Sequence, residues 1–154
     1  MNRDFEKISF EQFKKDVKDD RKLYDEYSIP QRDSDLTAGY DILLLEDITI
    51  KPKEIIKIPT GLKSVFNKDE VLLLVVRSSM GFKYNIRLCN QVGVIDADYY
   101  NNPDNEGHIF VKIQNEGDKE VTIKKGDAIA QGIFMKFLIT DSDKSLNIER
   151  RSDY

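Results

Sequence analysis

The pattern of hydrophobic and polar positions changes near residue 38. Before that point, apolar side chains recur at helical spacing between lysines and aspartates. Ser9 precedes this stretch and Gln12 lies three residues later, which is the arrangement of a capping box. The pattern predicts an amphipathic helix over residues 9–22 and a polar connector over 28–37. The apolar positions of the predicted helix are Phe10, Phe13 and Val17.

From residue 38 onward, short apolar segments alternate with clusters of glycine, asparagine, aspartate and proline. Regularly spaced short strands of this kind are typical of an antiparallel sandwich or barrel. The sequence thus predicts one all-β domain with its core at 38–138, a helical extension at 1–27 and a polar tail at 139–154. The predicted strands cover residues 40–45, 55–58, 61–66, 71–77, 86–88, 92–95, 108–114, 121–123 and 128–138.

Length and charge limit the class of protein. At 154 residues the chain fits a single domain with a sizeable core. Its formal net charge of -4 is unlike the basic face of a duplex nucleic-acid binder. No apolar run approaches the ~18 residues that span a membrane, and the first residues do not lead into a signal-peptide core. We therefore expect a cytoplasmic protein that binds neither nucleic acid nor membrane.

The single cysteine and the single histidine restrict the chemistry further. Cys89 cannot form an intrachain disulfide, which favours a reducing compartment, and its strand-like surroundings indicate a packed small side chain rather than a nucleophile. His108 alone cannot supply a multi-histidine metal site. Carboxylates, hydroxyls and arginine remain as the candidate chemistry.

Two acids and a tyrosine follow a short apolar run that opens with Gly93. Residues 93–99 read Gly-Val-Ile-Asp-Ala-Asp-Tyr. A strand that enters a turn can hold a carboxylate rigidly enough to act as a general base or a metal ligand. The candidates, Asp96 and Asp98, are two residues apart, which places them on one face of a strand. Taken alone, the segment also fits a solvated turn, and Asp98 either supports a site or caps the turn.

Arg77 ends a nearly all-apolar predicted strand and is followed by two serines. A guanidinium offers charged, forked donors, and nearby hydroxyls and backbone amides can complete a shell around phosphate. Residues 77–81, Arg-Ser-Ser-Met-Gly, therefore suit a phosphate site. An ordinary strand end with a capping serine is the alternative interpretation.

Together with two further segments, these motifs resemble the trimeric dUTPase family. The first motif corresponds to residues 38–41, Ala-Gly-Tyr-Asp, and the second to 77–79. The third corresponds to 93–99 and the fourth to 126–134. The segments follow the family's order across 38–138. The resemblance implies a jelly-roll-like β-barrel that assembles as a homotrimer with active sites at the subunit interfaces.

The resemblance also implies a reaction, the hydrolysis of dUTP to dUMP and pyrophosphate with Mg²⁺. This activity belongs to nucleotide metabolism, where it limits uracil incorporation into DNA and supplies dUMP. Asp96 would be the general base that deprotonates water for attack on the α-phosphorus. The Mg²⁺ ion would be held mainly by phosphate oxygens and water, with no protein ligand.

Substrate-binding roles follow from the same resemblance. Tyr99 would pack beneath the deoxyribose, where a 2′-hydroxyl has no room, although a purely structural core aromatic is the alternative. Asn90 and the hairpin backbone at Gly93 and Ile95 would read the uracil edge. Gln131 either binds phosphate or satisfies a backbone group. The residues assigned to the triphosphate are Arg77, Ser78, Ser79, Gln131 and Arg151. The supporting acids are Asp41 and Asp98.

Two departures from the family pattern matter. Residues 100–107 make the loop after Tyr99 about six residues longer than usual, which we interpret as a surface insertion. The family also ends in an arm containing Gly-Phe-Gly-Ser, whereas only its leading arginine is matched here, by Arg151. Either the sequence is truncated or the lid is absent. In the second case, the alternative is a nucleotide-binding or regulatory protein with weak turnover.

A dCTP deaminase is the nearest enzyme alternative, because it shares the fold and the Arg-Ser-Ser segment. Its chemistry needs a carboxylate for proton transfer in the strand after the hairpin. Lys112 stands at that position, and a lysine cannot replace the carboxylate. Hydrolysis of dUTP is therefore the favoured prediction.

Overall fold

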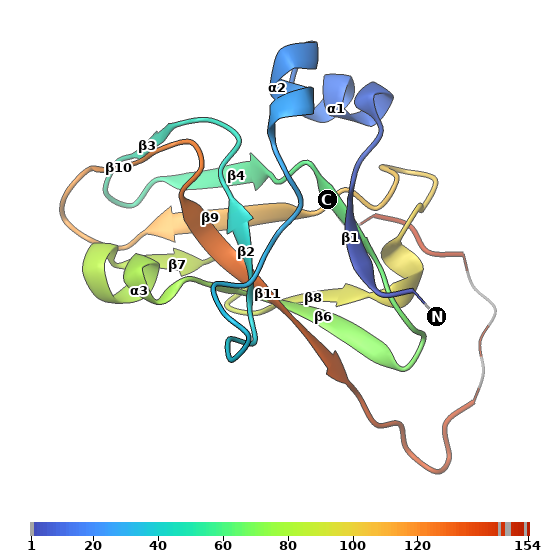
Figure 1. Cartoon of the computed structure of the whole chain (residues 1–154). Helices are drawn as coiled ribbons and strands as arrows, with labels where there is room; N and C mark the ends of the chain where they lie inside the picture. The colour runs from blue at the N-terminus through green and yellow to red at the C-terminus, as the bar shows by residue number, and fades with distance from the viewer. Residues whose placement is uncertain (1, 145, 147–148, 153) are drawn as a thin grey trace.

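The computed structural model of the chain is mostly β, with a small helical unit at one end (Figure 1). It describes every residue except 1, 145, 147–148 and 153. The strands are β1 (Asp4–Lys7), β2 (Tyr40–Leu43), β3 (Ile48–Ile50), β4 (Ile55–Pro59), β5 (Leu62–Val65), β6 (Glu70–Val76), β7 (Ile86–Leu88), β8 (Gly93–Asp96), β9 (Phe110–Asn115), β10 (Val121–Ile123) and β11 (Ala128–Lys136). The helical segments are α1 (Phe10–Asp16), α2 (Arg21–Glu26), α3 (Ser78–Tyr84) and the 3₁₀ turn η1 (Ala97–Tyr99).

The strands pair antiparallel throughout the described part of the chain. The largest sheet has the order β2-β11-β6-β8, and a second sheet has the order β4-β9-β7. The remaining strands form two ribbons, β1 with β5 and β3 with β10. The predicted antiparallel, mostly β architecture is confirmed. The pairings among the described residues do not close into the predicted barrel, because each ribbon pairs only within itself.

Alternation of buried and exposed positions places the core between the two larger sheets. In β6, Leu72 and Leu74 are almost completely buried while their neighbours are partly exposed. In the other sheet, Val111 and Ile113 of β9 are buried in the same cluster. Two apolar faces therefore pack against each other, which is the stable arrangement for sheets with one hydrophobic face.

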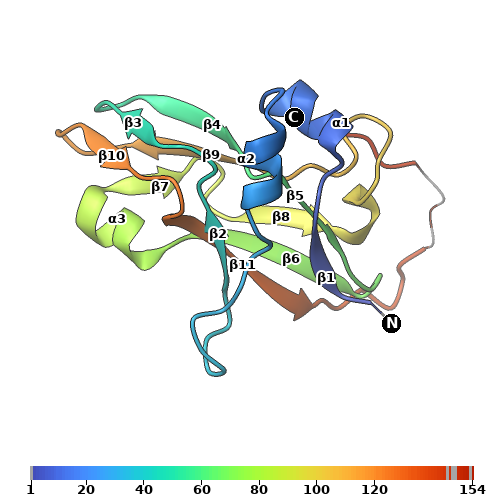
Figure 2. The ribbon, with the colours of Figure 1, turned by 45° about the horizontal axis from the view of Figure 1, so that its top comes forward.

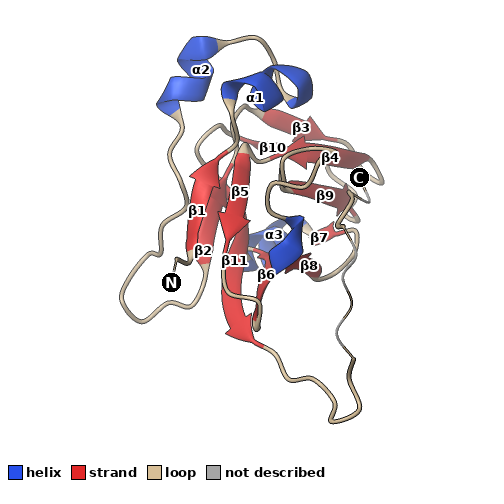
Figure 3. Cartoon of the chain, turned by 90° about the vertical axis from the view of Figure 1, so that its right-hand side faces the viewer, coloured by secondary structure: helices blue, strands red, loops and turns tan. Residues whose placement is uncertain are grey.

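The sequence prediction for residues 9–22 is wrong in one respect, because two short helices replace the single helix. Ser9 caps α1 as predicted, accepting a hydrogen bond from the Gln12 amide at 3.2 Å. The predicted capping box is not completed, because the Ser9 amide donates to Glu106 and the Gln12 side chain donates to Asp16. Asp20 then caps α2 by accepting from the Leu23 amide at 3.0 Å, so the chain turns between the helices. The helices lie side by side over one end of the sheets (Figures 2 and 3). In the described part of the chain, no helix is long and apolar enough to cross a membrane.

Two short strands and one α-helix were also missed by the sequence analysis. Strands β1 and β3 are only 4 and 3 residues long, too short for a clear alternating pattern. Helix α3 contains Gly81 and two serines, which are poor helix formers, so its sequence does not stand out. Elements this short are stabilised by their packing rather than by local propensity.

The predicted surface insertion, residues 100–107, exposes Asn101 and Pro103 but packs part of its length against the protein. Asn102 and Asn105 within it are only 5% and 9% exposed. Their side-chain oxygens accept hydrogen bonds from loop amides, Asn102 from Asp104 at 2.9 Å and Asn105 from Gly107 at 3.1 Å. Because the loop satisfies its own backbone groups, it can pack onto the body of the protein.

His108 joins the helical unit to the sheets. Its ring is completely buried, and Nε2 accepts a hydrogen bond from the Gly61 amide at 2.9 Å. An amide can only donate, so Nδ1 carries the proton and donates to Asp16 at 2.6 Å. Tyr27 of the extension donates to the Gly61 carbonyl at 2.8 Å. The helical unit is therefore held to the body by buried polar contacts.

Acidification is expected to weaken the fold through His108. Burial lowers the pKa of His108 from its ordinary 6.5, so the unfolded chain takes up a proton that the folded chain resists. The free energy of unfolding should therefore fall as the pH drops below about 6.5, which urea unfolding at pH ~7.5 and pH ~5.5 would measure. The hydrogen bond from Arg3 lowers the pKa of Glu70 to about 2. That carboxylate therefore stays ionised in the folded protein over the pH range of this measurement.

His108→Gln supplies the control, because its amide does not titrate in this range. The variant should be less stable than the wild type at neutral pH but should lose little further stability on acidification. The same pH-dependence in the variant and the wild type would contradict the assignment to His108.

Candidate active site

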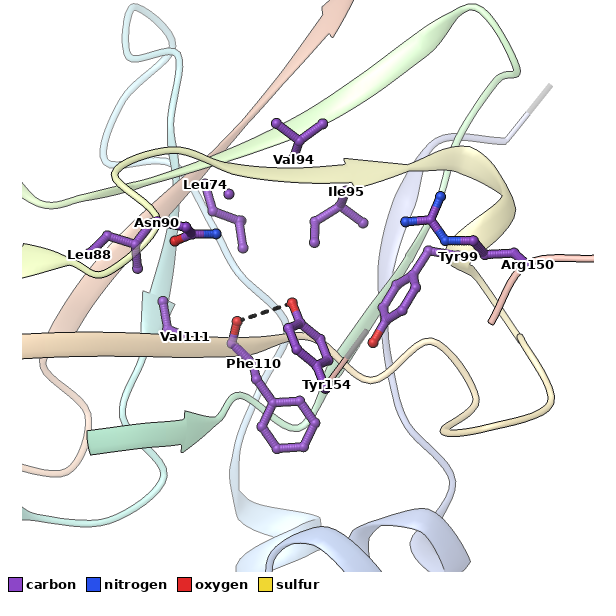
Figure 4. A pocket seen from close by; sticks show the side chains of 11 residues that line it. Leu74, Leu88, Asn90, Val94, Ile95, Tyr99, Phe110, Val111, Arg150 and Tyr154 are labelled. Atoms are coloured by element: carbon purple, nitrogen blue, oxygen red, sulfur yellow. Dashed lines mark hydrogen bonds between the residues drawn. The ribbon is translucent and has the colours of Figure 1, made fainter. Parts of the chain in front are cut away.

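A cavity of about 190 Å³ opens between β8 and β9 (Figure 4). Leu88, Ile95 and Val111 form apolar walls, and Asn90 and Tyr99 lie toward opposite ends. The cavity is small and combines apolar walls with several polar side chains, as small-molecule sites do. The structure thus brings together four of the predicted substrate-binding residues. They are Asn90, Gly93, Ile95 and Tyr99.

The turn between β7 and β8 shapes one end of this cavity. Gln91 adopts a left-handed backbone conformation with φ of 63°, and its amide donates to the Leu88 carbonyl at 2.9 Å. The turn leaves Asn90 exposed at the rim. Gly93 then starts β8 directly against Leu74, where an added Cβ would lie 3.0 Å from the Leu74 Cβ. A side chain there would push the two paired strands apart, so glycine keeps the cavity wall close.

Asp96 ends β8 beside the cavity, with 48% of its side chain exposed. Arg150 donates to Asp96 at 3.0 Å and to Asp98 at 3.3 Å, so one guanidinium bridges the two acids. The prediction that both acids share a strand face is wrong, because the chain turns into η1 directly after Asp96. They come together through Arg150 instead.

The C-terminal residues contribute to the cavity in a way that the sequence analysis missed. Arg150 and Tyr154 line it, and the Tyr154 ring lies edge-on to Tyr99 at 5.9 Å between centroids (Figure 4). Arg151, the predicted triphosphate contact, pairs with Asp104 of the 100–107 loop instead of facing the cavity. Arg150 and Arg151 are adjacent in sequence, and no local signal tells which of the two faces the cavity.

Tyr99 is held rigidly at its end of the cavity. Its hydroxyl donates to the His108 carbonyl at 2.7 Å and accepts from the Asn105 amide at 2.8 Å. Burial raises the pKa of Tyr99 to about 12, so the hydroxyl stays neutral and keeps both bonds at physiological pH.

A second polar cluster gathers around Arg77. Its guanidinium donates to Asp41 at 2.6 Å and contacts Asp33 at 3.4 Å. Burial raises the pKa of Asp41 and a hydrogen bond with Asp33 adds to this, whereas Arg77 opposes the shift. Gln131 lies directly opposite Asp41 in the pairing of β11 with β2. The first, second and fourth motifs therefore meet here, joined by Asp33 from the polar connector, which the sequence analysis did not single out.

Ser78 and Ser79 begin α3, directly after Arg77 at its N-cap. Both are exposed. In the first turn of a helix the backbone amides have no intrahelical partner and point outward, which favours anions at this end. The segment thus combines a guanidinium, two hydroxyls and the backbone amides of the first helical turn, all of which can donate hydrogen bonds to a phosphate.

The two clusters lie at opposite ends of β6. Asp96 of β8 pairs with Val71, near the start of β6, whereas Arg77 follows its last residue. Arg77 lies six positions after Val71, which at ~3.3 Å per residue of strand is about 20 Å. Within one chain, therefore, the candidate base and the candidate phosphate site do not face the same ligand.

Carboxylates are sparse near the cavity. Among the residues that the structure describes, no group of three or more histidine, cysteine, aspartate or glutamate side chains could hold a metal ion. Cys89, beside the cavity turn, is a partly buried free thiol. Any metal that acts here would need oxygen ligands from elsewhere, such as phosphates and water.

Comparison with known proteins identifies the family. The dUTPase family model matches residues 25–153, which include both clusters. The chain belongs to the dUTPase family. The deoxyuridine 5′-triphosphate nucleotidohydrolase of Lactococcus lactis subsp. lactis (strain IL1403) is 49% identical over 125 residues, 81% of this chain and 83% of the relative. That of Pseudomonas fluorescens (strain Pf0-1) is 41% identical over 116 residues, 73% of this chain and 72% of the relative.

Solved dUTPase structures share the fold. The crystal structure of the dUTPase from Streptococcus mutans is 39% identical with a TM-score of 0.74, covering 90% of this chain and 99% of that one. The dUTPase from phage phi11 of S. aureus is only 19% identical, and its TM-score of 0.70 over 97% of this chain and 99% of that one shows the fold alone. Residues 2–24 precede the region that the dUTPase family model matches.

Gly39, in the first dUTPase motif, lies so close to Gln131 that replacing it should disturb the Arg77 cluster. An added Cβ would lie 2.1 Å from Gln131 Oε1 and 3.0 Å from Gln131 Cβ. Gly39→Ala should therefore displace the Gln131 side chain and lower the free energy of unfolding by about 1–3 kcal/mol, as overpacking does. Urea unfolding would measure the change.

Gly81→Ala is the matched control, because an added Cβ at Gly81 meets nothing within 4 Å. In a helix, alanine is favoured over glycine by roughly 0.5–1 kcal/mol, so this variant should be no less stable than the wild type. Equal stabilities for the two variants would show that the space beside Gln131 is not restrictive.

Proposed function

We propose that the chain is a dUTP diphosphatase, which hydrolyses dUTP to dUMP and pyrophosphate. The observation that carries the proposal is the position of Asp96, a half-exposed carboxylate at the end of the strand that walls a nucleoside-sized cavity. Family membership and relatives at up to 49% identity support the same activity. The deaminase alternative needs a carboxylate where Lys112 stands, and neither the family nor these relatives favour it.

The cavity between β8 and β9 would hold the nucleoside. Asn90 and the backbone at Gly93 and Ile95 would hydrogen-bond the uracil edge, and the apolar walls would cover its faces. Tyr99 would pack beneath the deoxyribose, because its ring is held rigidly at one end of the same cavity. A ring fixed in this way excludes a 2′-hydroxyl by contact, so the discrimination would be steric.

Asp96 would act as the general base. Its carboxylate would orient a water molecule and accept its proton as the oxygen attacks the α-phosphorus. The bridge from Arg150 to Asp96 and Asp98 fixes the position of the Asp96 carboxylate beside the cavity. Pyrophosphate leaves with the electron pair of the broken P–O bond.

Arg77, Ser78, Ser79 and Gln131 would bind the triphosphate. The ion pair with Asp41 fixes the direction of the Arg77 guanidinium while leaving donors for phosphate oxygens. A divalent ion, which we propose to be Mg²⁺, would be held by the phosphates and water and would neutralise charge on the leaving pyrophosphate. The free thiol of Cys89 supports a reducing, cytoplasmic location.

The separation of the two clusters supports a site shared between copies of the chain. Asp96 and Arg77 lie about 20 Å apart along β6, too far for one triphosphate to contact both in one chain. Closed assemblies of identical chains bring such separated surfaces together. We therefore propose a homotrimer of jelly-roll-like subunits with interfacial active sites. Exposed apolar side chains on and after β11 would be covered in it. They are Met135, Phe137 and Leu138.

Asp96→Asn should abolish hydrolysis while leaving nucleotide binding nearly intact. The amide keeps the shape of the carboxylate but cannot accept a proton, and loss of a general base costs about 10²–10⁴ in rate. Pyrophosphate release from dUTP with Mg²⁺ would measure kcat, and calorimetry with a non-hydrolysable dUTP analogue would measure binding. Asp118→Asn, at an exposed site on the turn before β10, is the control.

More than half of the wild-type kcat in the Asp96→Asn variant would remove Asp96 from this role. Assays with dCTP and dTTP in parallel test the substrate. Ammonia release from dCTP would identify a deaminase, and binding of dUTP without turnover by the wild type would identify a regulatory protein.

Mixing two inactive variants should restore activity if sites are interfacial. Asp96→Asn removes the base, and Arg77→Gln removes the phosphate contact while keeping a hydrogen-bond donor for Asp41. Refolding them together at equal concentration should pair an intact Asp96 with an intact Arg77 at about a quarter of the interfaces. Each variant refolded alone is the control. No recovery on mixing, or full activity of a 17.9 kDa monomer in light scattering, would rule out shared sites.

A further inference from the structure

The loop over residues 100–107 wraps Tyr99 closely. The Asn102 side-chain amide donates to the Tyr99 carbonyl at 2.8 Å, and the Asn105 amide donates to the Tyr99 hydroxyl at 2.8 Å. One loop therefore binds both ends of the same residue, its backbone and its side-chain tip. Both asparagines are buried, so these bonds are shielded from competing water.

We propose that Asn105 is a positioning residue, which holds the Tyr99 ring where it excludes a ribose 2′-hydroxyl. The inference rests on the proposed function, because Tyr99 selects a sugar only if the cavity holds dUTP. It adds a residue outside the motifs on which the family resemblance rests. Asn105 does not line the cavity, so any effect on the ligand passes through the residues it contacts, of which Tyr99 lines the cavity directly.

The direction of each hydrogen bond in this contact is determined. The Gly107 amide can only donate, and it lies 3.1 Å from Asn105 Oδ1, so that atom is the acceptor. The Asn105 Nδ2 atom therefore faces Tyr99 and donates to its hydroxyl, with Ser152 as a second acceptor at 3.2 Å. The Tyr99 hydroxyl must then donate to the His108 carbonyl, 2.7 Å away. A hydroxyl with both roles filled cannot swing freely.

Close contact at Gly107 brings the loop onto Tyr99. Gly107 has φ of 87°, a conformation that favours glycine, and an added Cβ would lie 2.8 Å from the Tyr99 carbonyl oxygen. Asn102 donates to the Asn105 side-chain oxygen at 2.9 Å, which holds the two amides against each other. The Asn105 amide is thus oriented before any ligand binds.

The loop is in turn fixed to rigid elements. The Glu106 carboxylate accepts from the Ser9 amide at 2.7 Å and from Lys63 of β5 at 2.9 Å. Burial alone would raise the pKa of Glu106, but the hydrogen bonds from Ser9 and Lys63 lower it overall, so the carboxylate stays charged. His108, which directly follows the loop, is anchored to Asp16 of α1. Supporting contacts of this kind keep a binding side chain in its productive position.

Loss of the Asn105 amide should let the Tyr99 ring tilt and admit a ribose. In Asn105→Ala, the ratio of kcat/KM for dUTP to kcat/KM for UTP should fall by about tenfold or more. Steric exclusion of the 2′-hydroxyl depends on the position of the Tyr99 ring. The kcat for dUTP should change less, since Asp96 and its contacts are untouched. Tyr99→Phe should narrow the gap similarly, because it removes the hydroxyl that Asn105 binds.

The experiment measures kcat/KM for dUTP and UTP in the wild type, Asn105→Ala, Tyr99→Phe and the double variant. If Asn105 acts through the Tyr99 hydroxyl, the double variant should discriminate no worse than either single variant. Asn101→Gly is the matched control. Asn101 lies in the same loop with φ of 55°, which glycine adopts easily, and its side chain contacts Lys63 rather than Tyr99. Its discrimination should match the wild type.

The outcomes separate this proposal from the proposed function. A wild type that releases no pyrophosphate from dUTP overturns both. If the wild type prefers dUTP to UTP, three results would overturn only the role of Asn105. They are an unchanged ratio of kcat/KM for the two substrates in Asn105→Ala, additive effects in the double variant, and an equal loss of preference in Asn101→Gly. If Asn105→Ala fails to fold, Tyr99→Phe decides, because it removes the bond and leaves the loop amides in place. An unchanged ratio there also overturns the proposal.

Discussion

The pairing of β6 with a strand on each side is the constraint on which the rest of the structure depends. β6 bonds to β11 along one edge and to β8 along the other, with Leu72 and Leu74 buried in the core. A shift of one residue in either register would turn these leucines to the opposite face. The register therefore also determines where Arg77 and Asp96 emerge, one at each end of the strand.

Each end of β6 carries a different kind of chemistry. At one end, Arg77 is held by Asp41 and flanked by exposed serines, an arrangement suited to an anion. At the other, apolar walls and a half-exposed Asp96 suit an uncharged base and a water molecule. Rigid strands make both arrangements precise, but they also keep them apart. The proposed assembly of identical chains would bring the two arrangements together.

The two features outside the four family motifs, the helical extension and the 100–107 loop, turn out to be connected. Ser9 and Asp16 of the extension bond to Glu106 and His108 at the end of the loop. The loop then bonds to Tyr99 at the cavity. Hydrogen bonds are directional, and those made by the buried His108 and Asn105 are costly to leave unmade, so this chain of bonds stiffens the cavity from outside it.

Local pattern in the sequence determined the elements and the chemical inventory. Short apolar segments bounded by turn residues placed the longer strands within a few residues, Ser9 marked the start of α1, and four motifs pointed to the family. Helix α3 and the strands β1 and β3 were not predicted, because segments of three to seven residues show too little periodicity.

The tertiary structure alone decided which of these residues meet. It placed Arg150 rather than Arg151 at the cavity, added Asp33 to the Arg77 cluster, and put Asn105 on the Tyr99 hydroxyl. Asn105 and Tyr99 are close in sequence, yet their contact depends on the path of a loop that is itself tied to distant elements. Such contacts follow from strand register and loop path, which depend on packing across the whole chain and leave no local mark in the sequence.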